Sequence, residues 1–264
     1  MAGFPLCQSR SLGMDMRKSV VVTGGSKGIG WEIVCNLARA GYQVFSGART
    51  LRENIPEELR TSITQVRMDV RNEEDHFAIA EMASGDGFYL NAYVNNAGFS
   101  KWKTIEEIDS TFLNDIIATN LVGFFWGAKA AASHLSTGGS LVNISSIAGK
   151  RGSANNSAYV ATKFGITGLT QSLSKELGPK GIRVNAVCPV LIGTEGLMEA
   201  LLDLQSPAKG DPETFLREFT NSQSALGRLP LAQEVADLVN YLISNQSSAI
   251  TGQSINVDCG VLPT

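Results

Sequence analysis

Residues 19–30, SVVVTGGSKGIG, join a short apolar run to a glycine-rich turn. The run 19–23 predicts a buried strand, and a helical pattern follows the turn through Ala40. Glycines let the backbone approach a ligand, and the first turn of a helix offers free N–H groups to an anion. The segment is therefore a candidate phosphate cradle, with a tight strand-to-helix turn as the alternative. Gly24 and Gly28 are more widely separated than in the common dinucleotide pattern, so this loop alone does not decide the function.

Further apolar runs alternate with helical patterns along the chain, at 43–48, 63–68, 89–95, 140–144, 183–188 and 254–257. Strands separated by helices need crossover connections, which make the sheet parallel. The pattern predicts an α/β fold: a Rossmann-like, doubly wound parallel sheet of seven strands with helices on both faces, in one domain over 19–264. Residues 1–18 have no clear periodicity and are predicted to be a disordered tail, in which Met14 or Met16 could be the true start.

Composition excludes several classes of protein. The 264 residues carry a net charge of -3 with scattered Lys and Arg, which is unlike a nucleic-acid-binding surface. No apolar run approaches the roughly 20 residues needed to cross a bilayer, and the start of the chain lacks the apolar segment of a secretion signal, so we expect a cytoplasmic protein. The four cysteines form no C-x-x-C pair, which predicts buried thiols and no metal site. His76 and His134 are predicted to be surface histidines without a metal-binding role.

Tyr159 and Lys163 are the candidate proton-transfer pair. They stand four positions apart, so a helix would place them on one face. A free phenol ionises only near pH ~10, and a neighbouring ammonium is expected to lower the pKa of Tyr159 into a useful range. Ser146 would add a second hydroxyl aimed at a carbonyl oxygen. A solvated helical pair is the alternative for Tyr159 and Lys163 taken alone.

Asn120 lies inside the apolar run 116–126, where a buried amide must find hydrogen-bond partners. We expect ordered water to be its partner, with a neighbouring backbone carbonyl as the alternative.

Five motifs occur together in one order, and together they resemble the single-domain short-chain dehydrogenase/reductase family. They are Thr23-Gly24-x-x-x-Gly28-x-Gly30, Asn95-Asn96-Ala97-Gly98, Asn120, Ser146 and Tyr159-x-x-x-Lys163. The resemblance covers roughly residues 19 to 260. Within the family, the chain is similar to 3-oxoacyl-[acyl-carrier-protein] reductases and related sugar and alcohol dehydrogenases. It implies an oxidoreductase that interconverts a ketone and a secondary alcohol with a nicotinamide cofactor. Its catalytic residues would be Asn120, Ser146, Tyr159 and Lys163, with Asn120 holding a water that reloads the proton.

The cofactor is expected to be NADP(H) in preference to NAD. A cofactor without the 2′-phosphate is usually recognised by a carboxylate at the end of the second strand, and Ala48 stands there instead. Arg49 follows it and Lys27 lies in the glycine loop, so two cations could face the extra phosphate. A solvated cation at a strand end is the alternative for Arg49.

The resemblance also implies the remaining cofactor contacts. Asp69 and Val70 would hold the adenine, although Asp69 could instead cap the following helix. Val190 replaces the family's usual glycine, which puts the local backbone path in question. The full set of expected cofactor-binding residues is Gly24, Ser26, Lys27, Gly28, Ile29, Gly30, Arg49, Asp69, Val70, Asn96, Ala97, Gly98, Tyr159, Lys163, Pro189, Ile192 and Thr194.

The substrate is less well defined by the sequence. Residues 194–226 are expected to form a helical lid that closes over the substrate. Lys150 and Arg151 follow Ser146 closely, which favours a 3-oxoacyl, sugar or other polar carbonyl compound as substrate. Solvated loop charges explain the two residues equally well. A homotetramer or homodimer is implied by the resemblance. The competing hypothesis is a nucleotide-sensing protein without catalysis, and an epimerase or dehydratase is a third.

Overall fold

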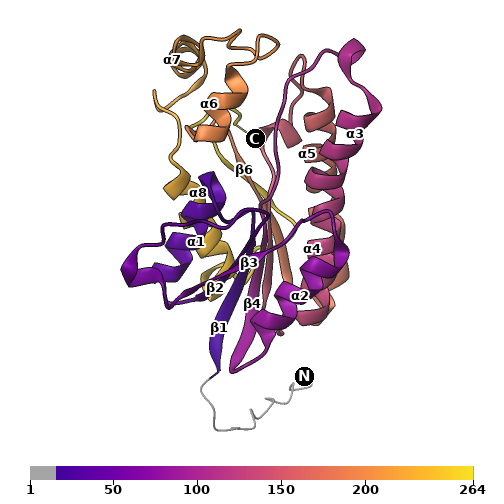
Figure 1. Cartoon of the computed structure of the whole chain (residues 1–264), viewed down its shortest axis with the longest axis vertical. Helices are drawn as coiled ribbons and strands as arrows, with labels where there is room; N and C mark the ends of the chain where they lie inside the picture. Colours follow the sequence, from indigo (N-terminus) through magenta and orange to yellow (C-terminus); the bar gives the residue numbers. More distant parts are fainter. Residues whose placement is uncertain (1–15, 264) are drawn as a thin grey trace, which may run out of the picture.

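The structure is a computed structural model that describes residues 16–263. The predicted tail lies mostly outside the described residues, as do Cys7 and the alternative start Met14. Within 16–263 the chain forms one parallel sheet flanked by helices (Figure 1), as the sequence predicted. No helix in this range combines the length and apolarity needed to span a bilayer.

Seven parallel strands form the sheet of the described chain, in the spatial order β3-β2-β1-β4-β5-β6-β7. The order reverses after β1, because β2 and β3 extend to one side and β4 to β7 to the other. The carboxyl ends of β1 and β4 therefore lie side by side at the switch point, where open α/β sheets bind ligands. The strands are β1 (Arg17–Thr23), β2 (Gln43–Ala48), β3 (Ile63–Arg67), β4 (Phe88–Asn95), β5 (Ser140–Ile144), β6 (Arg183–Pro189) and β7 (Ser254–Val257).

Helices cover both faces of the sheet and extend beyond one end of it (Figure 1). The helices α6 and α7 stand at that end (Figure 1). The helices are α1 (Gly28–Arg39), α2 (Glu73–Ser84), α3 (Ser110–Ile117), α4 (Gly123–His134), α5 (Ser157–Leu177), α6 (Glu195–Leu201), α7 (Pro212–Gln223) and α8 (Ala232–Ile243).

The first strand begins two residues earlier than the sequence indicated. Arg17 and Lys18 pair with Phe88 and Tyr89 of β4, so placing both in a disordered tail was wrong. Both side chains are exposed, which is why no apolar pattern marked them, yet the backbone pairing needs no apolar side chain. The guanidinium of Arg17 also lies 4.8 Å from the centre of the Phe88 ring.

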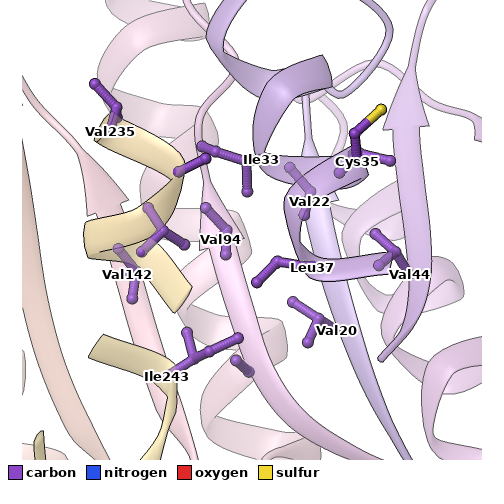
Figure 2. Packing of buried hydrophobic residues seen from close by; sticks show 14 of the residues in the cluster. Val20, Val22, Ile33, Cys35, Leu37, Val44, Val94, Val142, Val235 and Ile243 are labelled. Carbon is purple, nitrogen blue, oxygen red and sulfur yellow. The ribbon is translucent and has the colours of Figure 1, made fainter. Parts of the chain in front are cut away.

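Alternate residues of β1 face two separate halves of the core. Val20 and Val22 face α1 and α8, and Figure 2 shows Ile33 of α1 and Val235 of α8 among the same cluster. Val21 faces the opposite way, into the cluster that contains residues of α2 and α4. Because β1 is buried on both faces, its residues Val20, Val21 and Val22 are continuously apolar rather than alternating. This double burial holds the carboxyl ends of the strands in fixed positions.

The helices α6 and α7 share a small core of their own. Trp102, in the loop after β4, is 6 % exposed and packs with Leu201 and Ala208. Gln205 adds polar contacts to the same loop: its Oε1 accepts from the Thr104 N–H at 3.1 Å. Residues 194–226 are thus attached to the loop that leaves β4.

Candidate active site

The glycine loop between β1 and α1 can be built only from glycine at several positions. Gly24 and Gly28 have φ angles of 67° and 56°, in the left-handed region that L side chains avoid. A Cβ at Gly30 would lie 2.2 Å from the carbonyl oxygen of Gly24. The Gly24 N–H donates to the Gly47 carbonyl at 2.7 Å, which fixes the loop to β2. The loop therefore turns tightly and brings backbone to the surface of the switch point.

The start of α1 has the properties of an anion site. Lys27 occupies the cap position without a side-chain hydrogen bond to the helix, and no acidic residue lies in the first turn. The backbone of Gly28 is exposed, and Thr194 lies next to it, since a Cβ at Gly28 would be 3.6 Å from the Thr194 methyl group. Free N–H groups and the positive end of the helix dipole suit a phosphate. The residues present therefore fit the pyrophosphate of a dinucleotide.

Asn96 and Thr23 tie the end of β4 to the glycine loop. The Asn96 amide donates to the Thr23 carbonyl at 2.9 Å and to the Gly24 carbonyl at 3.3 Å. The Thr23 hydroxyl accepts from the N–H groups of Asn96 and Ala97 at 3.0 and 3.2 Å. The Asn96 side chain is thus occupied in bracing the loop, so Asn96 shapes the groove through this contact.

Ser146 and the pair Tyr159 and Lys163 meet at the other side of the switch point. Ser146 follows β5, and its hydroxyl lies near the Tyr159 phenol while donating to the Pro189 carbonyl at 3.4 Å. The Lys163 ammonium donates to the Ile144 carbonyl at 2.9 Å and lies 5.5 Å from the centre of the Tyr159 ring. The neighbouring Ser145 points elsewhere, donating to the Lys163 carbonyl at 3.2 Å. The structure therefore brings together the three residues that sequence spacing selected.

The electrostatics of this pair differ from expectation. Burial raises the pKa of Tyr159 to about 12, although the nearby Ser146 hydroxyl acts in the opposite direction. Burial lowers the pKa of Lys163 to about 8. The expectation that the ammonium makes the phenol more acidic is wrong for this structure, because desolvation penalises both charged forms. Tyr159 is thereby kept as a protonated donor.

Asn120 lies at the centre of the π-helical turn Ala118–Val122, which joins α3 to α4. Its side chain is fully buried and makes two hydrogen bonds to the backbone of Phe99: Nδ2 donates to the carbonyl at 2.7 Å, and Oδ1 accepts from the N–H at 3.0 Å. The alternative of a backbone partner is confirmed, because the loop after β4 supplies both a donor and an acceptor. Asn120 also lies against Gly98, where a Cβ would be 3.1 Å from Oδ1.

The two expected basic residues and one further arginine lie around the carboxyl end of β2 and the glycine loop. Lys27 and Arg49 are both exposed. Arg52 stacks over Trp31 at 4.4 Å and donates to the Ser26 carbonyl at 3.2 Å, beside the glycine loop. Sequence reasoning missed Arg52, which the repeated arginines of the segment ARTLR could have indicated.

Gln65 fixes the position of Arg52. Its Oε1 accepts from the Arg52 N–H at 2.7 Å, and its Nε2 donates to the Arg52 carbonyl at 2.8 Å.

Ile29, which the sequence predicted as a cofactor contact in the loop, is partly buried and packs against the core cluster between the sheet and α1 and α8.

The segment after β3 places Asp69 and Val70 near this end. The Asp69 carboxylate pairs with Arg71 at 2.6 Å, and that hydrogen bond holds the pKa of Asp69 below its usual range. The cap of α2 is Asn72, so Asp69 does not cap that helix. Asp69 is half-buried and Val70 is buried.

The segment after β6 includes Pro189, Ile192 and Thr194. Thr194 caps α6, its hydroxyl accepting from the Leu197 N–H at 3.3 Å. Val190 packs with Ile147 and Val261 and has no positive φ, so the replaced glycine leaves no strained backbone.

The Lys150 side chain is held by β7. Its ammonium donates to the Ser254 carbonyl at 2.7 Å, which ties it to β7. The idea that Lys150 recognises an anionic substrate is therefore not supported by its position.

His76 is a buried residue that sequence reasoning placed on the surface. It is fully buried on α2 and hydrogen-bonds with the Tyr93 hydroxyl at 2.8 Å and the Val70 carbonyl at 2.9 Å. The prediction failed because the first turn of α2 is acidic, which made the whole helix look solvated.

His134 is partly buried and hydrogen-bonds with the Ala130 carbonyl at 2.9 Å. In the described part of the chain, no three His, Cys, Asp or Glu side chains cluster as a metal site.

Comparison with known proteins matches residues 24–262 to the family model described as enoyl-(acyl carrier protein) reductase. The chain is 33 % identical over 256 residues to an (S)-acetoin-forming diacetyl reductase of Staphylococcus aureus, covering 94 % of this chain and 99 % of that protein. It is 32 % identical over the same length to a 3-oxoacyl-[acyl-carrier-protein] reductase of the same organism, with the same coverage.

Solved structures are similar to this chain over nearly its whole length. The ligand-free aldohexose dehydrogenase of Thermoplasma acidophilum superposes with a TM-score of 0.84 at 31 % identity, covering 95 % of this chain and 98 % of that chain. A tryptophan variant of actinorhodin polyketide ketoreductase, determined with NADPH, gives a TM-score of 0.82 at 30 % identity, covering 95 % and 99 %. The likeness extends over the whole described domain.

Proposed function

Because this chain belongs to the short-chain dehydrogenase/reductase family, we propose that it is an NADP-dependent oxidoreductase interconverting a ketone and a secondary alcohol. The observation that carries this proposal is the meeting of Ser146, Tyr159 and Lys163 beside a glycine cradle that suits a dinucleotide. Asn120 belongs to the same proposed site through its contacts with the loop after β4.

The proposed chemistry assigns one task to each residue. Bound NADPH supplies the hydride that the carbonyl carbon receives. Tyr159 donates its phenolic proton to the carbonyl oxygen as negative charge develops there, and the raised pKa keeps that proton in place until then. The Ser146 hydroxyl donates a hydrogen bond to the same oxygen, and Lys163 holds the ribose. Asn120 keeps the loop at Phe99 in position beside this reaction site.

The preference for NADP rests on charge at the adenosine end. Ala48 stands where a carboxylate would repel the 2′-phosphate, and Lys27, Arg49 and Arg52 lie around that place. The solved ketoreductase with NADPH supports the same preference. We expect Arg52→Gln to weaken NADPH binding by at least about tenfold and NADH binding hardly at all, as the loss of a charge-assisted contact to phosphate would do. Lys175→Gln, on the exposed side of α5, is the control.

We propose the region 194–226 as the lid over the substrate. It is held to the loop after β4 by Trp102 and Gln205, so its two attachments come from one side of the proposed pocket. The substrate is a polar carbonyl compound, such as a 3-oxoacyl thioester, a sugar or a small diketone, as the names of the relatives suggest. The cytoplasmic location expected from the sequence stays a prediction.

The decisive experiment measures NADPH and NADH oxidation with a panel of these carbonyl compounds, using wild type and Tyr159→Phe. We expect Tyr159→Phe to bind NADPH as wild type does and to lose nearly all turnover. Tyr241→Phe, an exposed tyrosine on α8, is the matched control. NADPH binding by wild type without turnover of any carbonyl compound would favour the nucleotide-sensing alternative.

We propose that the protein assembles as a homodimer or homotetramer through α4 and α5. Phe125 and Phe164 are 48 % and 46 % exposed on these helices, and isolated large aromatics at such exposure suit a protein interface. Light scattering of wild type and Phe125→Glu tests this: wild type should be oligomeric, and the variant should dissociate.

A further inference from the structure

The buried pair His76 and Tyr93 connects α2 to the segment that follows β3. Both side chains are fully buried, and the His76 ring hydrogen-bonds on both of its nitrogens. The Val70 carbonyl can only accept a hydrogen bond, so the His76 Nε2 must carry a proton. In the neutral ring Nδ1 is then bare and accepts from the Tyr93 hydroxyl. Burial lowers the pKa of His76, which agrees with this neutral form.

The backbone at 69–70 is fixed on both sides of one peptide group. The Asp69 N–H donates to the Asp75 carboxylate at 2.7 Å, and the Val70 carbonyl is held by His76 at 2.9 Å. The start of α4 closes the third side, since a Cβ at Gly123 would lie 2.9 Å from the Val70 carbonyl oxygen. The peptide group between Asp69 and Val70 therefore has little freedom to rotate.

One donor of this segment is left without a partner. Within residues 16–263, the Val70 N–H makes no hydrogen bond, although Val70 is only 9 % exposed. A backbone N–H in such a place needs an acceptor. The ring nitrogens of adenine are acceptors of the right kind, and the clamp that orients this donor comes from α2.

We propose that His76 is a positioning residue for the adenine half of the cofactor: by holding the Val70 carbonyl it fixes the backbone at Val70 so that the Val70 N–H faces the base. This inference rests on the proposed binding of NADP at the switch point. His76 touches neither cofactor nor substrate and acts through the Val70 carbonyl. Its effect should therefore fall on cofactor affinity and leave the chemical step alone.

The test needs a variant that removes the clamp without leaving a buried polar group unpaired. His76→Leu alone would leave the Tyr93 hydroxyl without a partner and could unfold the region. The double variant His76→Leu, Tyr93→Phe removes both polar groups, an exchange that is often nearly neutral for stability. His76→Gln retains a donor toward Val70, Tyr93→Phe alone keeps the His76 contact, and His134→Gln is the control histidine.

Binding of 2′,5′-ADP, measured by calorimetry, reports the adenine half without any turnover. Reduced nicotinamide mononucleotide reports the other half. We expect the double variant to melt near the wild-type temperature, to bind 2′,5′-ADP about tenfold more weakly, as the loss of one well-placed hydrogen bond would give, and to bind the mononucleotide unchanged. Turnover at saturating NADPH should stay at the wild-type value, and His76→Gln should restore affinity to within about twofold.

Four outcomes would overturn the inference. A double variant that binds 2′,5′-ADP as wild type does would show that the clamp has no role in binding. Equal losses for 2′,5′-ADP and the mononucleotide would make His76 a structural residue only, as would affinity that follows the melting temperature across the variants. A wild-type protein that binds neither 2′,5′-ADP nor NADPH would refute the proposed function as well, which distinguishes this outcome from the first three.

Discussion

Lys163 is expected to destabilise the free protein, and replacing it with methionine measures by how much. Lys163 is 4 % exposed, and its ammonium keeps one hydrogen bond, to the Ile144 carbonyl. Its pKa falls from 10.5 to about 8 because burial disfavours the charge. A shift of this size corresponds to roughly 3 kcal/mol at neutral pH, from about 1.4 kcal/mol per pKa unit. Lys163→Met removes that penalty but leaves the Ile144 carbonyl without its donor, which costs about 1–3 kcal/mol.

The pH dependence separates these two effects. The folded pKa lies below the unfolded value, so the penalty is fully present below about pH 8 and disappears as the pH rises toward the unfolded pKa. Between about pH 7 and about pH 9.5, wild type should gain roughly 2 kcal/mol of unfolding free energy relative to Lys163→Met. The lost hydrogen bond contributes equally at both values. Tyr159 is present in both proteins, so its own ionisation cancels to first order in the comparison.

Urea denaturation of both proteins at the two pH values, at equal protein concentration, gives the four free energies of unfolding. The variant should also lose carbonyl reduction, because the ribose contact proposed for Lys163 is gone. A stability difference that stays constant over this pH range would refute the reasoning, since it would mean that the ammonium is as well solvated in the folded protein as in the unfolded chain.

Three further predictions concern the loop, the lid and an ion pair. Gly30→Ala should abolish NADPH binding in a fluorescence titration, because its Cβ would lie 2.2 Å from a carbonyl oxygen of the same loop; Gly168→Ala, which meets no atom within 4 Å, should bind normally. Trp102→Ala should destabilise the protein by about 3–5 kcal/mol and make 194–226 the first site of limited proteolysis; unchanged cleavage there would contradict the attachment described. Hydrogen bonding to Arg228 lowers the pKa of Glu234 to about 2, so its contribution to stability is present above the unfolded pKa of 4.5 and lost as the pH falls toward 2. Glu234→Gln should accordingly melt below wild type near neutral pH and converge with it in acid, whereas a constant gap would contradict the ion pair.

The sequence predicted what depends on local order along the chain. Strand-helix alternation gave the seven parallel strands, and the four-residue spacing of Tyr159 and Lys163 was enough to place them on one helix face. It did not predict properties that arise only when distant segments pack. The pKa values of Tyr159 and Lys163 depend on how deeply α5 is buried against β5 and β6.

The missed contacts have the same origin. Asn120 finds its partner in Phe99, 21 residues away, and His76 finds Tyr93 across the interface of α2 with the sheet. Arg52, in the segment that follows the carboxyl end of β2, donates to the glycine loop. Each pair joins segments whose relative position follows from the sheet order, which neither composition nor periodicity contains.

The placement of Asn120 depends on the number of residues in the π-helical turn Ala118–Val122. A wider turn accommodates one residue more than a regular helix of the same rise. Deleting a single residue here would therefore let an ordinary α-helix run through while the side chains downstream keep their present faces. Phe124, 2 % exposed against α5, would stay buried, but Asn120 would leave the loop it holds. Gene variants that lose one codon between 118 and 122 should therefore keep the helix packing and lose the contact between Asn120 and Phe99.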